Sequence, residues 1–327
     1  LGGKNVLTLG TEYVYDDVFD EISAYQYLVD QTTQGFGVFL QSDWEINPSL
    51  TFLSGIRMDQ HNLVDDVVLS PRASLLYKHN DNTQFRLNYG AGFRAPQAFD
   101  TDLHIAFAGG GISRISLSPE LKPEKSHSFS TSINFDKPME QWIAGFTWEG
   151  FYNRLNDAFF LQPIGEDQFG ELFDKQNGDG ATVQGVTLEL RANYNRKIQL
   201  EGGFTLQSSK FDNPVEYIDG LPGVRAFART PNDYGYAILN FTPNTRLSAT
   251  FNYVYTGKMQ TPHFAGAPNQ SIDEIIKTAT FSEYSTKVSY TLPFKGLSSD
   301  IELYGGVKNL FNAYQDDFDI GKNRDSN

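Results

Sequence analysis

Apolar and polar side chains alternate with a period of two over residues 83–94. Gln84, Arg86 and Asn88 occupy even positions, and the intervening odd positions carry Phe85, Leu87, Tyr89, Ala91 and Phe93. A β-strand directs successive side chains to opposite faces. The segment therefore predicts a strand with one apolar face and one polar, charged face.

The same alternation recurs along most of the chain. It predicts about thirteen strands, most of about ten to twelve residues, the length that a tilted strand needs to cross a bilayer. The first segment and the segment 233–242 fit the pattern less cleanly. The predicted strands are 4–15, 35–46, 50–59, 69–78, 83–93, 127–135, 142–152, 183–192, 198–207, 233–242, 247–256, 284–292 and 301–307.

Short and long connections alternate between these strands. The short ones carry turn-forming residues, as in Asn47-Pro48-Ser49 and Asn80-Asp81-Asn82. Outer-membrane barrels place short turns at one rim and long extracellular loops at the other. We therefore predict an all-β chain that forms a transmembrane antiparallel β-barrel, with a soluble β-sandwich as the alternative. Long loops are expected near 17–34, 60–67, 94–120, 158–180, 209–230, 258–279 and 313–327.

Composition narrows the possible functions. The chain has 327 residues, no cysteine, 14% aromatic residues and a net charge of −14. This charge argues against nucleic-acid binding, which needs a basic face. The chain contains no run of about 18 apolar residues, the length that would predict a membrane-spanning helix. The mean hydropathy of −0.40 is typical of soluble proteins. It is also compatible with a membrane barrel, because half of the residues in each barrel strand are polar.

The strand count predicts that the chain is part of a barrel. An odd number of strands, with the last one rising to the long-loop rim, would leave an unpaired edge in lipid. Bacterial single-chain barrels close with an even number. We therefore expect residues 1–327 to be one partial barrel domain, with further residues on both sides.

Several motifs resemble those of TonB-dependent outer-membrane receptors. The clearest is the sequence GAGFRAP at residues 90–96, followed by Phe99-Asp100 and Leu103-His104. Each motif is loose alone, but together they occur in the right order over nearly the whole chain. The supporting matches are Gly55-Ile56-Arg57-Met58-Asp59, Leu69-Ser70-Pro71-Arg72, the segment 117–124 (LSPELKPE) and Gly306-Val307-Lys308-Asn309-Leu310-Phe311.

The resemblance implies a barrel of about 22 strands with a plug domain in its lumen. This chain would supply roughly strands nine to twenty-one and would lack the plug, the TonB-contacting segment and the last strand. The complete receptor would import a scarce, large nutrient across the Gram-negative outer membrane. A ferric siderophore, cobalamin or haem would bind at the extracellular mouth, and the TonB–ExbB–ExbD complex would move the plug. The chain's other contacts would be outer-membrane lipids, and no bound cofactor is implied.

Charged side chains on the predicted polar faces are candidates for docking the plug. In an unplugged, porin-like barrel the same side chains would be solvated by lumen water, and the resemblance favours docking. These residues are Arg57, Asp59, Arg72, Arg86, Glu189, Arg191, Glu201 and Lys287.

Candidate ligand-binding residues lie in the long loops. A long loop above a polar lumen is where a ligand would first make contact. For the candidates that belong to the family motifs, the alternative is a structural role shared across the family instead of ligand contact. The candidates are Arg94, Phe99, His104, Phe107, Tyr217, His263 and Phe264.

Metal and enzyme chemistry have weaker signals. Asp16, Asp17, Asp20 and Glu21, or else Asp317, Asp319, Asn323 and Asp325, could hold Ca²⁺, yet neither set has EF-hand spacing. Surface acidity explains both sets better. The five histidines match no catalytic motif, and Glu189 with Glu201 fits a salt-bridged lining better than a catalytic pair. The chain is therefore predicted not to be an enzyme, although a soluble glycan-active protein is kept as an alternative.

Overall fold

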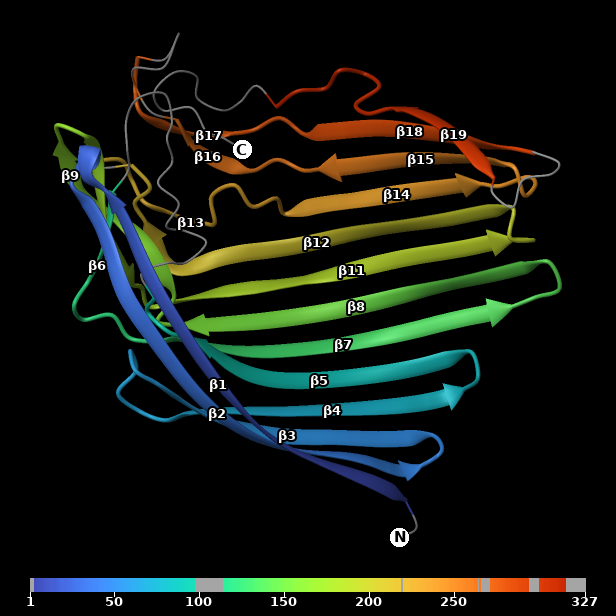
Figure 1. Ribbon diagram of the computed structural model, residues 1–327, viewed down its shortest axis with the longest axis horizontal. Coiled ribbons are helices and arrows are strands. Elements are labelled where there is room, and N and C mark those ends of the chain that lie inside the picture. The colour runs from blue at the N-terminus through green and yellow to red at the C-terminus, as the bar shows by residue number, and fades with distance from the viewer. Residues whose placement is uncertain are drawn as a thin grey trace.

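A computed structural model describes residues 3–97, 114–218, 220–263, 265, 271–293 and 300–315. Its main sheet runs through thirteen strands, each antiparallel to its neighbours and in nearly sequential order (Figure 1). The strands are β1 (Lys4–Ile22), β2 (Tyr27–Asn47), β3 (Leu50–His61), β4 (Val68–Asn80), β5 (Thr83–Arg94), β7 (Glu124–Pro138), β8 (Trp142–Asn156), β11 (Gly180–Tyr194), β12 (Ile198–Val215), β14 (Asp233–Phe241), β15 (Leu247–Thr256), β18 (Phe281–Leu292) and β19 (Ile301–Val307).

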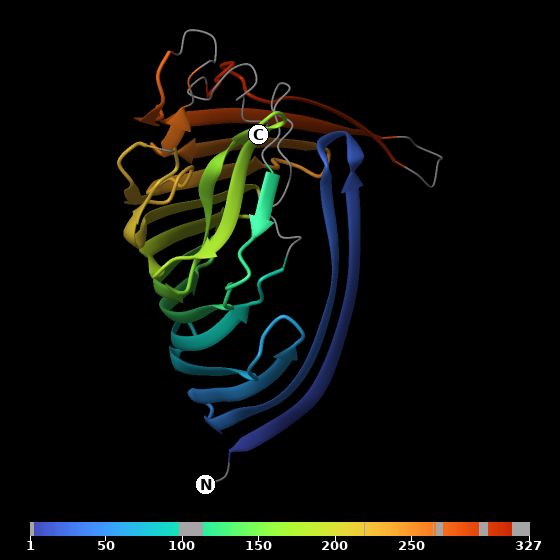
Figure 2. The same cartoon turned by 90° about the vertical axis from the view of Figure 1, so that its left-hand side faces the viewer.

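The main sheet is a single curved layer, and no second sheet of the described residues is stacked along its length (Figures 1 and 2). This confirms the predicted partial barrel and excludes the sandwich. In the part of the chain that the structure describes, no helix is long and apolar enough to span a membrane.

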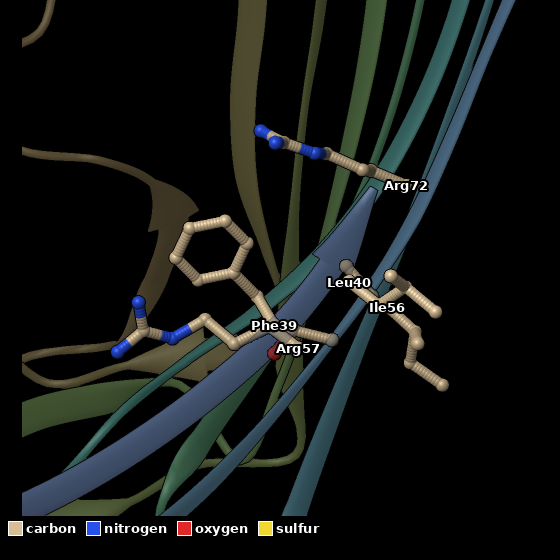
Figure 3. Close-up of a pocket in the computed structure, with 7 residues that line it drawn as sticks. Phe39, Leu40, Ile56, Arg57 and Arg72 are labelled. Carbon is tan, nitrogen blue, oxygen red and sulfur yellow. The ribbon is translucent and has the colours of Figure 1, made fainter. Parts of the chain in front are cut away.

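Strand pairing separates an apolar face from a polar one. Leu40 pairs with Ile56, and Arg57 pairs with Ser70 one position further along β3. Figure 3 shows Leu40 and Ile56 on one side of the sheet, and Phe39, Arg57 and Arg72 extending from the other side into the space that the sheet encloses. The outward apolar side chains remain exposed, including Leu87 at 57% and Leu190 at 55%. A continuous exposed apolar face of this kind requires an apolar surrounding.

Asparagine side chains close several of the short turns. Asn47 and Asn80 each accept a hydrogen bond from the backbone N–H two residues later, at 2.9 Å. In later turns Asn193 accepts from the Arg196 N–H three residues on at 2.8 Å, and Asn244 accepts from the Arg246 N–H two residues on at 2.9 Å. Asn and Asp side chains favour turns by making these local bonds. The turn chemistry read from the sequence therefore forms the short-turn rim.

Aromatic side chains gather next to these short turns. Tyr77 stacks on Phe85 across β4 and β5, with ring centroids 6.2 Å apart. Trp142 and Tyr194 approach to 4.5 Å. Aromatic pairs at this level of the apolar face are typical of the belt that lies at a membrane interface.

The long connections contain more regular structure than the sequence predicted. The expected loop 17–34 is wrong: β1 and β2 continue to a tight tip, a 3-10 turn η1 (Ser23–Tyr25), and form a hairpin above the wall. The expected loop 209–230 begins inside β12, which extends to Val215. The hairpin forms because the backbones of β1 and β2 pair as far as Ile22 and Tyr27. The acidic residues at the end of β1 made this segment resemble a loop in the sequence.

Short strands build a layer at the long-loop rim. β6 (Arg114–Leu117), β10 (Gly170–Asn177) and β9 (Phe159–Asp167) form a separate sheet, hereafter the loop sheet. β13 (Val224–Ala226) pairs with β12, and β16 (Gln260–His263) pairs with β17 (Glu274–Lys277). Figures 1 and 2 place the loop sheet at one end of the main sheet, over its concave side.

A charge on the apolar face tests the membrane orientation. Leu87→Arg should destabilise the protein by about 2–4 kcal/mol in lipid vesicles, because an arginine at mid-membrane depth would face hydrocarbon. Urea unfolding of vesicle-refolded protein measures this. Ser132→Arg is the matched control, since Ser132 pairs with Arg86 on the polar face and its substitution should cost much less. Equal costs for the two substitutions would contradict the assignment of faces.

Candidate functional site

The register of the main sheet brings all eight predicted lumen residues to one face. Cross-strand partners share a face, and an unbroken series of pairs connects these residues from β3 to β18. The series is Arg57↔Ser70 and Arg72↔Gly90, then Arg86↔Ser132, Ser132↔Glu149, Glu149↔Thr187, Arg191↔Glu201, Glu189↔Gly203, Glu201↔Ile238, Ile238↔Asn252 and Thr250↔Lys287. The sequence pattern thus located the polar wall, although it did not predict which charges pair.

Arg57 is held on this wall by two carboxylates. Its Nε donates to both carboxylate oxygens of Asp59 at 2.8 and 2.9 Å, and its Nη2 donates to Glu12 at 2.8 Å. Arg72 donates to the side-chain oxygen of Gln41. Both arginines line a cavity of about 370 Å³ with Phe39 and Ser70 (Figure 3). This stretch of wall therefore presents ordered guanidinium groups to the enclosed space.

Further along the sheet, a carboxylate also holds the Arg191 guanidinium, whereas Lys287 contacts a ring. Arg191 donates to both carboxylate oxygens of Asp136 at 2.6 and 2.7 Å and to Thr147 at 2.8 Å. The Lys287 ammonium lies 4.7 Å from the centroid of the Tyr304 ring. Bidentate arginine–carboxylate bonds fix the orientation of the guanidinium group as well as its charge.

Among the residues described, no group of three or more metal-ligating side chains occurs.

Sequence reasoning missed a cavity at the long-loop end of the polar wall. It has a volume of about 580 Å³, and we call it the tyrosine cavity. Strand pairing places Tyr234, Tyr236 and Val254 on the polar face. Their side chains are apolar or aromatic, and 37%, 41% and 44% of their surfaces are exposed there. Arg229, Thr230 and Gln207 also line it. The sequence does contain a signal, because Tyr234 and Tyr236 are two positions apart and so share one face of a strand. The prediction missed the cavity because it considered only charged residues on that face.

Glycine permits the close packing of one of these tyrosines. A Cβ on Gly203 would lie 2.6 Å from Cε1 of Tyr236. The ring therefore lies flat against the neighbouring strand, where a side chain would otherwise displace it. The result is an aromatic surface beside an arginine, a combination that can stack on a planar ring and contact its negative oxygens.

Arg94 belongs to a cluster that docks the loop sheet on the wall. Its guanidinium and the Lys175 ammonium each lie 4.8 Å from the centroid of the Phe159 ring. Glu124 accepts from Arg94 at 3.4 Å and from the Phe159 backbone N–H at 3.0 Å. Lys175 is buried, with 1% of its surface exposed. Arg94 therefore connects β5 to β9, so its ligand contact stays a prediction.

The other ligand candidates divide into two groups. Tyr217 uses its hydroxyl within its own loop, donating to the Ala226 carbonyl at 3.0 Å and accepting from the Ala228 N–H at 2.9 Å. Burial raises the pKa of this hydroxyl. His263 lies at the end of β16, paired with Glu274. Phe99, His104, Phe107 and Phe264 lie outside the described residues.

The predicted acidic clusters do not form metal sites in the described part of the chain. Asp16, Asp17, Asp20 and Glu21 lie on β1, where alternation sends Asp17 and Glu21 to one face and the other two to the opposite face. Asp17 accepts a hydrogen bond from Thr32 at 3.1 Å, and Glu21 accepts one from Ser23 at 2.9 Å. Asp317, Asp319, Asn323 and Asp325 lie beyond the residues described.

A second ion pair fixes the base of the loop layer. Arg154 binds both carboxylate oxygens of Asp212, with Nη1 2.6 Å from Oδ1, and also contacts Thr182 at 3.2 Å. These hydrogen bonds to Arg154 lower the pKa of Asp212. Gly180 begins β11 beside them at φ +149°, and a Cβ there would lie 2.6 Å from the Leu155 carbonyl oxygen. This junction therefore requires glycine.

Comparison with known proteins identifies the family. A family model described as TonB dependent receptor-like, beta-barrel, matches residues 1–310. The chain therefore belongs to the TonB-dependent receptor β-barrel family, as its motifs predicted. It is 22% identical over 348 residues to the ferrienterobactin receptor of Escherichia coli K12, covering 94% of this chain and 43% of that protein.

Solved structures of similar fold include siderophore receptors. One is the ferric-catecholate import receptor Fiu of E. coli K12, at TM-score 0.68 and 14% identity, covering 98% of this chain and 50% of that one. Another is a variant of the Pseudomonas aeruginosa ferric enterobactin receptor PfeA in complex with enterobactin, at TM-score 0.68 and 17% identity, covering 95% and 47%. The siderophore receptor PirA of Acinetobacter baumannii gives 0.66 and 18%, covering 94% and 48%. The chain thus spans about half the length of the proteins it matches.

The Arg154–Asp212 pair predicts a pH dependence of the loop base. The pKa of Asp212 is lowered in the folded chain, so its stabilising effect is present above the unfolded value of about 3.9 and is lost as pH falls through the folded pKa. The protection of amides over residues 180–183, taken relative to the intrinsic exchange rate at each pH, should fall in that acidic window. Asp212→Asn should exchange faster already at neutral pH and lose the acid step. An unchanged acid step in Asp212→Asn would assign it to another group.

Proposed function

We propose that the complete protein is a TonB-dependent outer-membrane receptor that imports a ferric siderophore. The observation that carries this proposal is the family match over residues 1–310. It is supported by a polar, charge-lined wall beneath a layer of long loops. Energy would come from the TonB–ExbB–ExbD complex of the inner membrane through a plug outside this chain.

Among siderophores we favour the ferric catecholates. The curated relative is a ferrienterobactin receptor, and Fiu is a ferric-catecholate receptor. The tyrosine cavity offers matching chemistry, because tyrosine rings can stack on aryl groups and Arg229 can contact their anionic oxygens. Cobalamin and haem, which the resemblance alone allowed, have no such specific support. They become comparison ligands in the tests.

We further propose that the polar wall docks the plug. Arg72 carries a positive charge whose hydrogen bond goes to the neutral Gln41 side chain, so an acidic group of a plug could pair with it. Arg57 and Arg191 are held in fixed geometries by carboxylates. Ordered charges of this kind suit repeated docking and release, since they need no reorganisation when the partner arrives. A plugless channel is the alternative, and a large ion conductance in planar bilayers would favour it.

Removing the cavity arginine tests the proposed binding surface. Arg229→Ala in the full-length receptor should weaken ferric enterobactin binding about ten- to a hundredfold, because a charge-assisted contact contributes about 1.5–3 kcal/mol. Binding of radiolabelled ferric enterobactin to outer-membrane vesicles measures the affinity. Arg246→Ala, in a short turn at the opposite rim, is the matched control and should leave the affinity unchanged. Equal affinities for all three proteins would remove the tyrosine cavity from the binding site.

Growth tests the class of nutrient. A strain in which this receptor is the sole candidate importer should grow on ferric enterobactin as iron source and should stop growing when the receptor gene is deleted. Haem as iron source, and cobalamin in a cobalamin-requiring background, are supplied in parallel. Deletion should leave growth on these two unchanged. Growth on ferric enterobactin without the receptor would contradict the proposed substrate, and a defect confined to haem or cobalamin would replace it.

A further inference from the structure

Basic side chains gather across four neighbouring strands, β7, β8, β11 and β12, at the long-loop end of the main sheet (Figure 1). His127 of β7 pairs with Arg154 of β8. Arg154 pairs with Thr182 of β11, which pairs in turn with Lys210 of β12. Cross-strand partners share a face. Lys125 lies two positions from His127 and therefore on that face as well. We call Lys125, His127, Arg154 and Lys210 the basic row.

The basic row faces outward, on the same side of the sheet as the apolar face. Tyr89 lies two positions from the outward Leu87 on β5 and shares its face. Phe129 is the partner of Tyr89, and Tyr152 is the partner of Phe129. Arg154 follows two positions after Tyr152 on β8. The row is therefore separated by the sheet from the inner wall and the tyrosine cavity.

The height of the basic row matches the level of lipid headgroups. At about 3.4 Å per residue and a tilt of about 40°, the stretch of β8 from Trp142 to Tyr152 crosses roughly 26 Å, close to the apolar band of about 25 Å. Tyr152 therefore marks the upper edge of the hydrocarbon, and Arg154 lies just above it. The Tyr89 hydroxyl is hydrogen-bonded to Nδ1 of His127 at 3.0 Å. The aromatic belt and the basic row are thus in direct contact.

The basic row is positively charged on a chain whose net charge is −14. Asp212 compensates the charge of Arg154 by accepting two hydrogen bonds from its guanidinium. Lys125 and Lys210 lie on either side of this pair and are exposed. Within the described part of the chain, neither lysine forms an ion pair with a carboxylate. The row therefore presents two uncompensated charges at headgroup level, where an anion from the membrane can reach them.

We propose that the basic row binds a phosphate group of an outer-leaflet glycolipid of the lipid A type. A phosphate monoester carries about 1.5 to 2 negative charges at neutral pH, which the two lysines match. The acyl chains of the same molecule would lie on the apolar face below Tyr89, Phe129 and Tyr152, so one lipid contacts both surfaces. The inference rests on the outer-membrane location in the proposed function, and it is independent of which nutrient the receptor imports.

Lipid binding by the full-length receptor tests the proposal directly. Native mass spectrometry from a neutral detergent measures the affinity for bisphosphorylated lipid A. Lys125→Gln combined with Lys210→Gln should weaken this affinity about tenfold or more, because lysines at an anionic lipid surface each contribute to binding. Both side chains are exposed, so the thermal unfolding midpoint should stay at the wild-type value. An unchanged affinity would overturn the proposal, as would a wild-type receptor that does not bind lipid A.

A matched pair of lysines at the opposite rim controls for net charge. Lys137 is on the same face of β7 at its short-turn end, paired with Ala144, and Lys197 is in the turn between β11 and β12. Lys137→Gln with Lys197→Gln should leave lipid A affinity unchanged, and an equal loss in both pairs would overturn the proposal. Lys125→Arg with Lys210→Arg keeps both charges and should retain the affinity. A loss as large as that of the glutamine pair would contradict charge recognition.

Competing anions identify the source of the phosphate. Inorganic phosphate in large excess should not displace lipid A, because it cannot use the apolar face, and displacement would assign the row to free phosphate instead. Phosphatidylglycerol carries a single phosphodiester charge and should bind more weakly. Equal affinity for the two lipids would overturn the assignment to lipid A in favour of any anionic lipid.

Ferric enterobactin binding separates this proposal from the proposed function. The Lys125→Gln, Lys210→Gln receptor should bind ferric enterobactin as the wild type does, because the row lies on the outer face and the tyrosine cavity on the inner one. Loss of lipid A binding together with retained ferric enterobactin binding supports the proposal. A wild-type receptor that binds lipid A through the row but does not bind ferric enterobactin refutes the proposed substrate and supports the lipid site.

Discussion

Backbone hydrogen bonding in a medium without water is the constraint on which this structure depends. An unpaired N–H or C=O group in hydrocarbon costs several kcal/mol, so spanning strands must pair along their whole length. The antiparallel pairing of neighbours from β1 to β19 meets this requirement within the described sheet. The same pairing fixes every side chain to one face. A slip of one residue would send Arg86 toward lipid and Leu87 toward the lumen, which is why the register is so strongly specified.

The polar wall follows from this register, and its charges are not evenly arranged. Arg57 and Arg191 each lie against carboxylates, whereas Arg72 is bonded to an amide. At the long-loop end the wall changes to tyrosines beside Arg229. One face of the sheet thus carries fixed charges along most of the wall and an aromatic surface at the long-loop end. Both arrangements use the inward positions that the strand period provides.

The loop layer is stabilised by contacts that connect distant segments. Tyr217 fastens its own loop through Ala226 and Ala228, and the Arg229 N–H then bonds the Gln260 carbonyl of β16 at 2.8 Å. Asn177 of β10 is bonded to both the amide and the carbonyl of Lys122. These bonds make the layer a set of linked units above a rigid wall. Arg114 of β6 adds a further link, since its guanidinium donates to the Tyr25 carbonyl at the hairpin tip at 3.2 Å.

The alternation of residues such as Arg86 and Leu87 determined the strands, their two faces and the eight polar-wall positions, because a period of two is a local property that any strand expresses. The asparagines of the short turns also act locally, through bonds to residues two or three positions away. Only the tertiary structure decided that β1 and β2 continue as a hairpin, since their pairing joins residues up to 41 positions apart, from Lys4 to Glu45. It likewise decided the tyrosine cavity and the contacts of Arg114 in the loop layer. Arg114 meets Tyr25 across 89 positions and Asp167 across 53, and no local pattern encodes a contact that exists only after the sheet has curved.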